Sequence, residues 1–70
     1  MFVVLNMVDG NPGNCHITDT WSRAMDLVVQ LAKEQGAVDP ESAIREELEM
    51  DNDYKVDDHI RIYILAPEAT

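Results

Sequence analysis

Cys15, His16 and His59 are the residues whose types could support metal binding or nucleophilic catalysis. Zinc needs three or four ligands at workable spacing, and these three residues have no such spacing. Cys15 and His16 are adjacent, and neighbouring side chains in a strand point to opposite faces. We therefore expect no metal, no cofactor and no catalytic residue here. Cys15 is interpreted as a small buried hydrophobic residue and the histidines as surface residues. A metal- or thiol-dependent enzyme built on these three residues is the alternative.

Two other motifs, a calcium-binding loop and a phosphate-binding loop, also lack residues that they require. Asp51-Asn52-Asp53 begins like a calcium loop, but Val56 and Ile62 stand where that loop needs Gly and Glu. Gly10 and Gly13 lie in turn-forming sequence and are not followed by the Lys-Ser/Thr of a phosphate-binding loop. The sequence therefore predicts a protein that is not an enzyme.

Carboxylates are the most abundant chemical feature of the chain. Fourteen Asp and Glu face five Lys and Arg, which gives a formal charge of −9. Nine of these acids and only two of the bases lie between residues 39 and 58. Phosphate contacts need Lys and Arg, so this charge disfavours direct binding to nucleic acid or to an anionic membrane.

The acidic segment has two interpretations. An acidic helix commonly serves solubility. Alternatively, the segment docks on a basic partner, including one whose groove normally holds nucleic acid, because such a charge steers the encounter. The candidate partner-binding residues are Glu46, Glu47, Glu49, Asp51, Asp53, Asp57 and Asp58.

Two helices and two long strands would position these side chains. Residues 2–8 are β-branched and apolar and predict a strand. Residues 20–35 follow the i, i+3, i+4, i+7 apolar pattern of a helix, which Thr18, Asp19 or Thr20 can cap and Gly36 can end.

A second helix is expected to start at Asp39-Pro40, with Asp39 as N-cap and Pro40 at the first helical position. Residues 54–65 alternate and predict a last strand, which Asp57-Asp58 could split by a turn or bulge. Residues 11–14 fit a type II turn, after which residues 14–18 either return as a short strand or stay a loop. Pro67 ends the strand before a loose tail.

These elements predict one α+β domain over residues 1–70, in the order β(β)ααβ. A sheet of two or three strands, with its two long strands adjacent, carries both helices on one face. Two helices cannot cover both faces of a sheet, so one apolar face stays open for binding or packs under the loop at residues 9–14. The candidate self-association residues on that face are Phe2, Val4, Tyr63 and Leu65, which would make a homodimer. The alternative function is therefore a homo-oligomeric structural or small-ligand-binding module that uses this face.

Size and cysteine content add two expectations. A core of this size rarely supplies more than about 3–5 kcal/mol of stability, so oligomerisation or a larger partner is the favoured aid. A single cysteine forms no internal disulfide, and no apolar run or signal peptide is evident. We expect a cytoplasmic protein.

The chain resembles the small acidic proteins that bacteriophages encode against host defence, of which anti-CRISPR proteins are the best known. The resemblance rests on its length, its charge of −9, the acidic segment from Asp39 to Asp58 and the βααβ plan. The likeness covers the whole chain at the level of type and carries no family motif. It implies a stoichiometric inhibitor that occludes a basic nucleic-acid channel without catalysis.

Overall fold

The computed structural model describes residues 1–66. Over this range the chain forms an α+β fold in the order ββααββ. The elements are β1 (Phe2–Val8), β2 (Asn11–Thr18), α1 (Trp21–Glu34), α2 (Glu41–Asp51), β3 (Asp53–Lys55) and β4 (Ile60–Leu65). The tail predicted after Pro67 lies outside the described residues.

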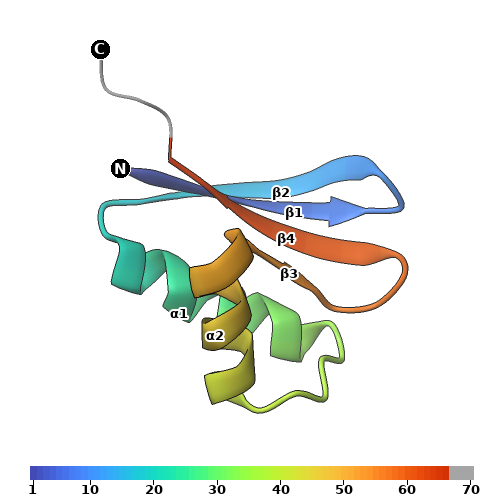
Figure 1. The fold of residues 1–70 in the computed structure, drawn as a ribbon. Helices are drawn as coiled ribbons and strands as arrows, with labels where there is room; N and C mark the ends of the chain where they lie inside the picture. The colour runs from blue at the N-terminus through green and yellow to red at the C-terminus, as the bar shows by residue number, and fades with distance from the viewer. Residues whose placement is uncertain (67–70) are drawn as a thin grey trace.

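One antiparallel sheet holds all four strands in the order β2-β1-β4-β3 (Figure 1). The two long apolar strands, β1 and β4, are the central pair, with Val4 opposite Ile64 and Asn6 opposite Ile62. Their predicted adjacency is therefore confirmed, whereas the predicted count of two or three strands is wrong.

The extra strand arises where the segment 54–65 divides at its two aspartates. The Asp57 Oδ1 atom accepts hydrogen bonds from the backbone N–H groups of His59 (2.7 Å) and Ile60 (2.9 Å). A side chain that bonds backbone groups two or three residues on favours a turn over a continuous strand. The segment consequently folds back as a hairpin, in which Tyr54 pairs with Ile62.

The first hairpin turns earlier than the sequence predicts. Asp9 and Gly10 both have positive φ (53° and 78°), as a two-residue type I′ hairpin turn requires. The type II turn expected over residues 11–14 does not form, because these residues already belong to β2. Pro12 is tolerated there because β2 is an edge strand.

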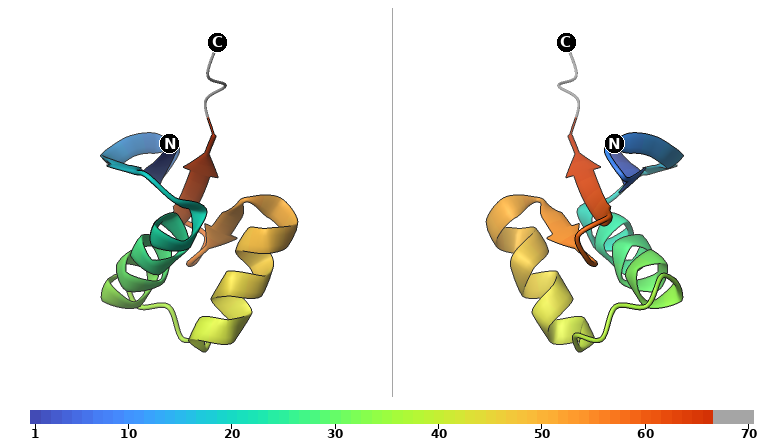
Figure 2. Two further views of the ribbon diagram at one scale, coloured as in Figure 1. Left: turned by 90° about the vertical axis from the view of Figure 1, so that its left-hand side faces the viewer. Right: turned by 90° about the vertical axis from the view of Figure 1, so that its right-hand side faces the viewer.

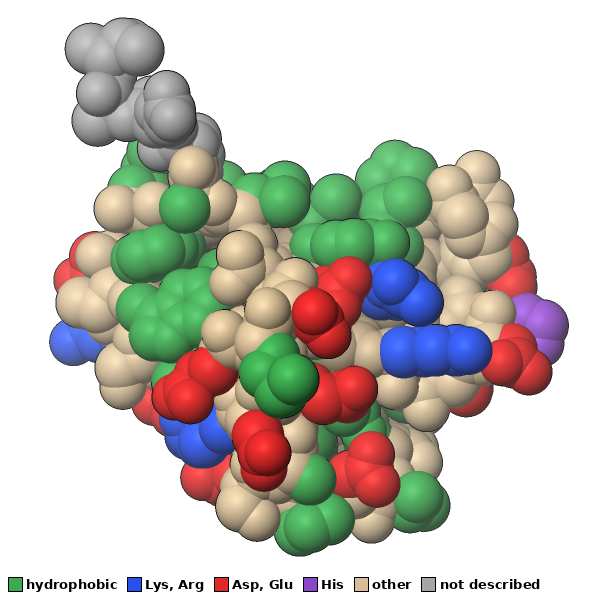
Figure 3. Space-filling view, viewed as in Figure 1, with side chains coloured by type: hydrophobic (Ala, Val, Ile, Leu, Met, Phe, Trp, Pro, Cys, Tyr) green, Lys and Arg blue, Asp and Glu red, His purple; other side chains and the backbone are tan. Residues whose placement is uncertain are grey.

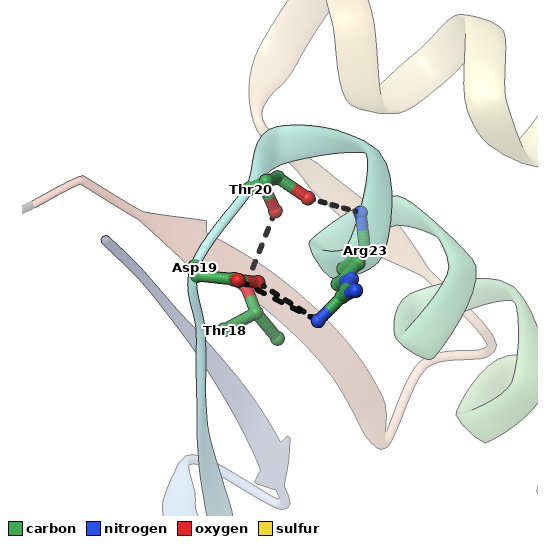
Figure 4. Close-up of polar contacts among 4 residues, drawn as sticks. All are labelled: Thr18, Asp19, Thr20 and Arg23. Carbon is green, nitrogen blue, oxygen red and sulfur yellow. Dashed lines mark hydrogen bonds and ion pairs between the residues drawn. The ribbon is translucent and has the colours of Figure 1, made fainter.

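Helix α1 matches its prediction within one residue at each end. The Thr20 hydroxyl oxygen accepts a hydrogen bond from the Arg23 backbone N–H at 3.2 Å, so Thr20 is the N-cap (Figure 4). Arg23 also pairs with Asp19 at 3.3 Å, and the Thr18 hydroxyl donates to the Thr20 carbonyl at 3.3 Å. Gly36, with φ of 98°, follows the helix as expected.

Helix α2 starts one position later than predicted. Pro40 is the N-cap, and no side chain caps the helix. The expected cap, Asp39, instead accepts a hydrogen bond from the buried Tyr54 hydroxyl at 2.6 Å. Asn52, in the left-handed region with φ of 60°, ends the helix.

Both helices pack on one face of the sheet, as predicted (Figures 1 and 2). The core between the layers contains Val4, Ala24, Met25, Val28, Val29, Ala32, Ile44, Leu48, Tyr54, Ile62 and Ile64. One buried polar side chain joins it: Asn6 exchanges two hydrogen bonds with the Gln35 amide, at 3.2 and 2.9 Å. We call the opposite side of the sheet the outer face.

Candidate functional site

The seven predicted partner-binding acids fall into two groups. Asp53, Asp57 and Asp58 are engaged in local contacts: Asp53 pairs with Arg61 at 3.4 Å, Asp58 pairs with Lys55 at 3.1 Å, and Asp57 forms the turn described above. Asp53 and Asp58 therefore each have a basic neighbour in the β3–β4 hairpin, and Asp57 accepts backbone hydrogen bonds in its turn.

The other four acids lie together on α2 and are exposed. Among the described residues no ion pair or side-chain hydrogen bond engages them. We call this group the α2 acidic surface; its members are Glu46, Glu47, Glu49 and Asp51. In Figure 3 acidic side chains gather over the lower half of the molecule, where Figure 1 places α2.

The two ends of α2 differ in electrostatics. Near its start, Arg45 bonds Asp26 of α1 and also Glu41, at 2.9 Å in the second case. The hydrogen bond to Asp26, and then that to Glu41, raise the pKa of the Arg45 guanidinium above its usual value. The last turn contains no basic residue. Acidic side chains at a helix C-terminus oppose the helix dipole, so part of the α2 acidic surface is placed where it costs stability.

An exposed methionine lies within this surface. Met50 is 75 % exposed and sits in sequence between Glu49 and Asp51. Methionine is flexible and polarizable and suits binding surfaces that adapt to a partner. The α2 acidic surface therefore offers an apolar contact point surrounded by carboxylates.

The outer face of the sheet is the second candidate surface, and its composition corrects the sequence prediction. Val4 is fully buried, and Phe2 packs against the core, edge-to-face with Trp21 at 5.6 Å between ring centroids. Both were expected on the open face. Tyr63 and Leu65 do lie on the outer face, and Leu65 is 46 % exposed.

The residues that join Tyr63 and Leu65 come from the other side of β1 and from β2. Val3 pairs with both Ile17 and Leu65, which makes one apolar row across three strands. Leu5 pairs with Cys15 and Tyr63, which makes the next row. Met7 follows, opposite Arg61. Both sides of β1 carry apolar residues, so its sequence pattern did not show which side faces the helices.

The metal-ligand candidates lie apart. Cys15 is exposed on the outer side of β2, not buried as predicted. His16 points to the helix side, where its Nε2 atom is buried without a hydrogen-bond partner. His59 is in the β3–β4 loop, and its Nδ1 atom lies 2.6 Å from Asp9. This hydrogen bond raises the pKa of the His59 imidazole.

Residues 1–66 contain no group of three or more Cys, His, Asp or Glu side chains placed to hold a metal ion. Two shallow hollows are present. One is lined by Met1, Ile17, Thr18, Asp19 and Arg23, and the other lies beside the β3–β4 loop, near Tyr63 and His59.

Comparison of the chain with protein-family models, with curated proteins and with solved structures finds no match. In the described part of the chain, neither helix has the length and apolar character needed to cross a membrane.

Proposed function

We propose that this chain is a non-enzymatic binding protein that docks on a basic protein through the α2 acidic surface. The partner is a protein whose basic groove normally holds nucleic acid, and the chain inhibits it by occluding that groove. The observation that supports this proposal most strongly is the set of four exposed carboxylates on one helix with no opposing cation in the described residues.

Their position on the helix separates this proposal from a role in solubility alone. Glu49 and Asp51 lie in the last turn of α2, where no basic residue offsets them and where the helix dipole disfavours negative charge. Solubility is served equally well by carboxylates at positions that do not cost stability. A functional surface that costs stability is a known form of the trade-off between stability and activity.

The chemistry of carboxylates favours a basic protein as the partner. Ionised Asp and Glu only accept hydrogen bonds, and they pair with Arg in a strong two-bond geometry that phosphate also satisfies. A net charge of −9 speeds the encounter with a positive groove and repels nucleic acid itself. Occlusion of a nucleic-acid channel, as in the anti-CRISPR type of inhibitor, follows from that competition.

The test compares two variants that carry the same net charge. The α2 variant replaces the acidic surface by amides, as Glu46→Gln, Glu47→Gln, Glu49→Gln and Asp51→Asn. The control variant removes the same number of charges at exposed acids elsewhere, as Asp19→Asn, Asp26→Asn, Glu34→Gln and Asp58→Asn. Asp19, Asp26 and Asp58 each lose an ion pair by this change, so circular dichroism is used to check that both variants are folded before capture. Each protein is biotinylated at Cys15, which is exposed and lies on β2, and is incubated with a nuclease-treated lysate of the cells that naturally make it.

We expect the unmodified protein and the control variant to retain a basic nucleic-acid-binding protein that added DNA or RNA displaces. The α2 variant should lose this protein, and retention by the other two should weaken as salt rises. Equal capture by the two variants, or capture that nucleic acid does not compete with, would refute the proposal.

A further inference from the structure

The outer face carries an arrangement of side chains that folding of one chain does not explain. The side of β1 that faces the helices includes a polar residue, Asn6, which needs Gln35 to satisfy it. The side that faces away from them holds Val3, Leu5 and Met7. In β1, therefore, the side that carries the polar residue faces the helices. Its wholly apolar side is half-buried, and neither helix packs over it.

Neighbouring strands extend this apolar side into a patch. The members of the patch are Val3, Leu5, Met7, Cys15, Ile17, Tyr63 and Leu65, and Ile17 is 70 % exposed. Hydrophobic side chains also line the upper margin of Figure 3, where the sheet lies. Contiguous apolar patches of more than a few hundred Å² are uncommon on monomers and mark interaction sites.

We propose that a second copy of this chain covers the outer face, so that two sheets pack face to face in a symmetric dimer. This surface is separate from the α2 acidic surface. The two helices lie on the opposite side of the sheet (Figures 1 and 2), so the dimer presents both acidic surfaces outward.

Charge supports a second copy as the occupant. Among the acids of residues 1–66, Asp53 alone lies within a strand of the sheet, and it is paired with Arg61. Lys55 is the other charged residue on this side. Although the chain carries −9 overall, two outer faces therefore meet without bringing acidic surfaces together. A strongly basic or strongly acidic partner would find no charge complement here.

Symmetry supports the same occupant. A two-fold axis between the sheets and parallel to the strands places the row of Ile17, Val3 and Leu65 over the same row of the second copy. That axis exchanges the β2 side with the β3 side. Arg61 of one copy consequently lies over the β1–β2 side of the other and not over its own counterpart.

The available area indicates a weak dimer. Four strands about 4.8 Å apart and three rows of side chains about 6.8 Å apart give a face of roughly 400 Å² before side-chain relief is counted. Two such faces give roughly 800 Å², which is below the lower limit of about 1,200 Å² of accessible surface for specific interfaces. We therefore expect dissociation in the micromolar range or weaker.

The experiment is sedimentation velocity over a wide concentration range, at low and at high salt. We expect a monomer–dimer equilibrium that tightens with salt, because the contact is apolar and salt screens the repulsion between two negatively charged copies. Leu5→Glu should weaken the dimer about tenfold or more by placing a charge at its centre. Val38→Glu, at a loop position 95 % exposed, is the matched control and should leave it unchanged.

A second measurement leaves Val3, Leu5, Met7, Tyr63 and Leu65 unchanged and does not depend on how well Leu5→Glu folds. Cys15 is labelled with a nitroxide in one sample and mixed with unlabelled, ¹⁵N-enriched protein. Intermolecular broadening should fall on the amides of β1 and β4 and spare α2. A monomer at every concentration, or broadening centred on α2 or on the free edge of β3, would overturn the inference. Loss of the dimer leaves the proposed docking of α2 untouched, because that docking weakens with salt.

Discussion

The electrostatic cost of the α2 acidic surface leads to a prediction that needs no partner. We expect Glu49→Gln combined with Asp51→Asn to stabilise the protein. Both residues are exposed at the C-terminal end of α2, where no basic residue lies in the last turn. Amides of the same shape keep the helix propensity nearly constant and remove only the charge.

The magnitude follows from two effects. An unfavourable charge in the last turn of an exposed helix costs about 0.3–1 kcal/mol. Asp51 also lies four residues after Glu47, and a like-charge pair at that spacing costs about 0.2–0.5 kcal/mol. The double change should therefore raise the free energy of unfolding by about 1–2 kcal/mol. For a domain of this size that corresponds to a rise in Tm on the order of 4–16 °C.

Urea unfolding followed by circular dichroism, with thermal melts beside it, measures the effect. Glu41→Gln is the matched control with opposite sign, because Glu41 lies in the first turn of α2 and pairs with Arg45 at 2.9 Å. It should destabilise the protein. Both effects should shrink in about 1 M salt, where the screening length is about 3 Å. The electrostatic explanation would be wrong if the double variant were no more stable than the natural chain, or if salt did not reduce its gain in stability.

Three further predictions concern side chains that join distant segments. Burial, and then the hydrogen bond to Asp39, raise the pKa of Tyr54 to about 12. The free energy of unfolding should stay constant below about pH 10 and fall by about 1.4 kcal/mol per pH unit as pH rises toward 12. The reason is that Tyr54 ionises at lower pH in the unfolded chain than in the folded protein. Tyr54→Phe should flatten this slope in alkaline unfolding curves. The raised pKa of His59 means that its pair with Asp9 stabilises the fold below about pH 6.5 and loses that effect as pH rises through the raised value. Asp9→Asn should abolish the shift in an NMR titration of the imidazole, and an unchanged titration would contradict the contact. Asn6→Ala and Gln35→Ala should show a coupling energy of about 1–2 kcal/mol in a double-mutant cycle, and additive losses would mean that the amides do not interact.

Strong local signals explain which parts of the fold could be predicted from sequence. The α1 apolar period, with three cap candidates before it and Gly36 after it, located that helix within one residue, and the two long apolar segments were predicted to be adjacent strands. Asp57 and Asp58 were recognised as a break, but the three-residue strand β3 was missed. So short a strand has too few residues for an alternating pattern, and pairing with β4 defines it.

Long-range contacts account for the remaining errors. Both sides of β1 are largely apolar, so periodicity could not show which one meets the helices. Asn6 is polar, and a polar residue would be expected on the exposed side, yet its side faces the helices. Gln35, 29 residues later, provides the amide that satisfies the hydrogen-bonding groups of the buried Asn6 side chain. Asp39 similarly caps no helix because the Tyr54 hydroxyl, 15 residues away, engages its carboxylate.

The division of the acidic segment was also beyond the sequence pattern. All seven predicted acids look equivalent in a charge count, whereas the fold gives Asp53 and Asp58 basic neighbours from the β3–β4 hairpin. What remains is the α2 acidic surface. Its four residues form no ion pair in the described part of the chain.

Photo-crosslinking tests whether the partner contacts helix α2. A benzoylphenylalanine photo-crosslinker replaces Met50, which is 75 % exposed within the α2 acidic surface, and in a second protein it replaces Val38, which is 95 % exposed outside it. After irradiation in a nuclease-treated lysate of the cells that naturally make the protein, position 50 should yield a cross-link to a basic nucleic-acid-binding protein, and excess nucleic acid should suppress it. Position 38 should yield no such product. Equal cross-linking from both positions, or none from position 50, would contradict docking through α2.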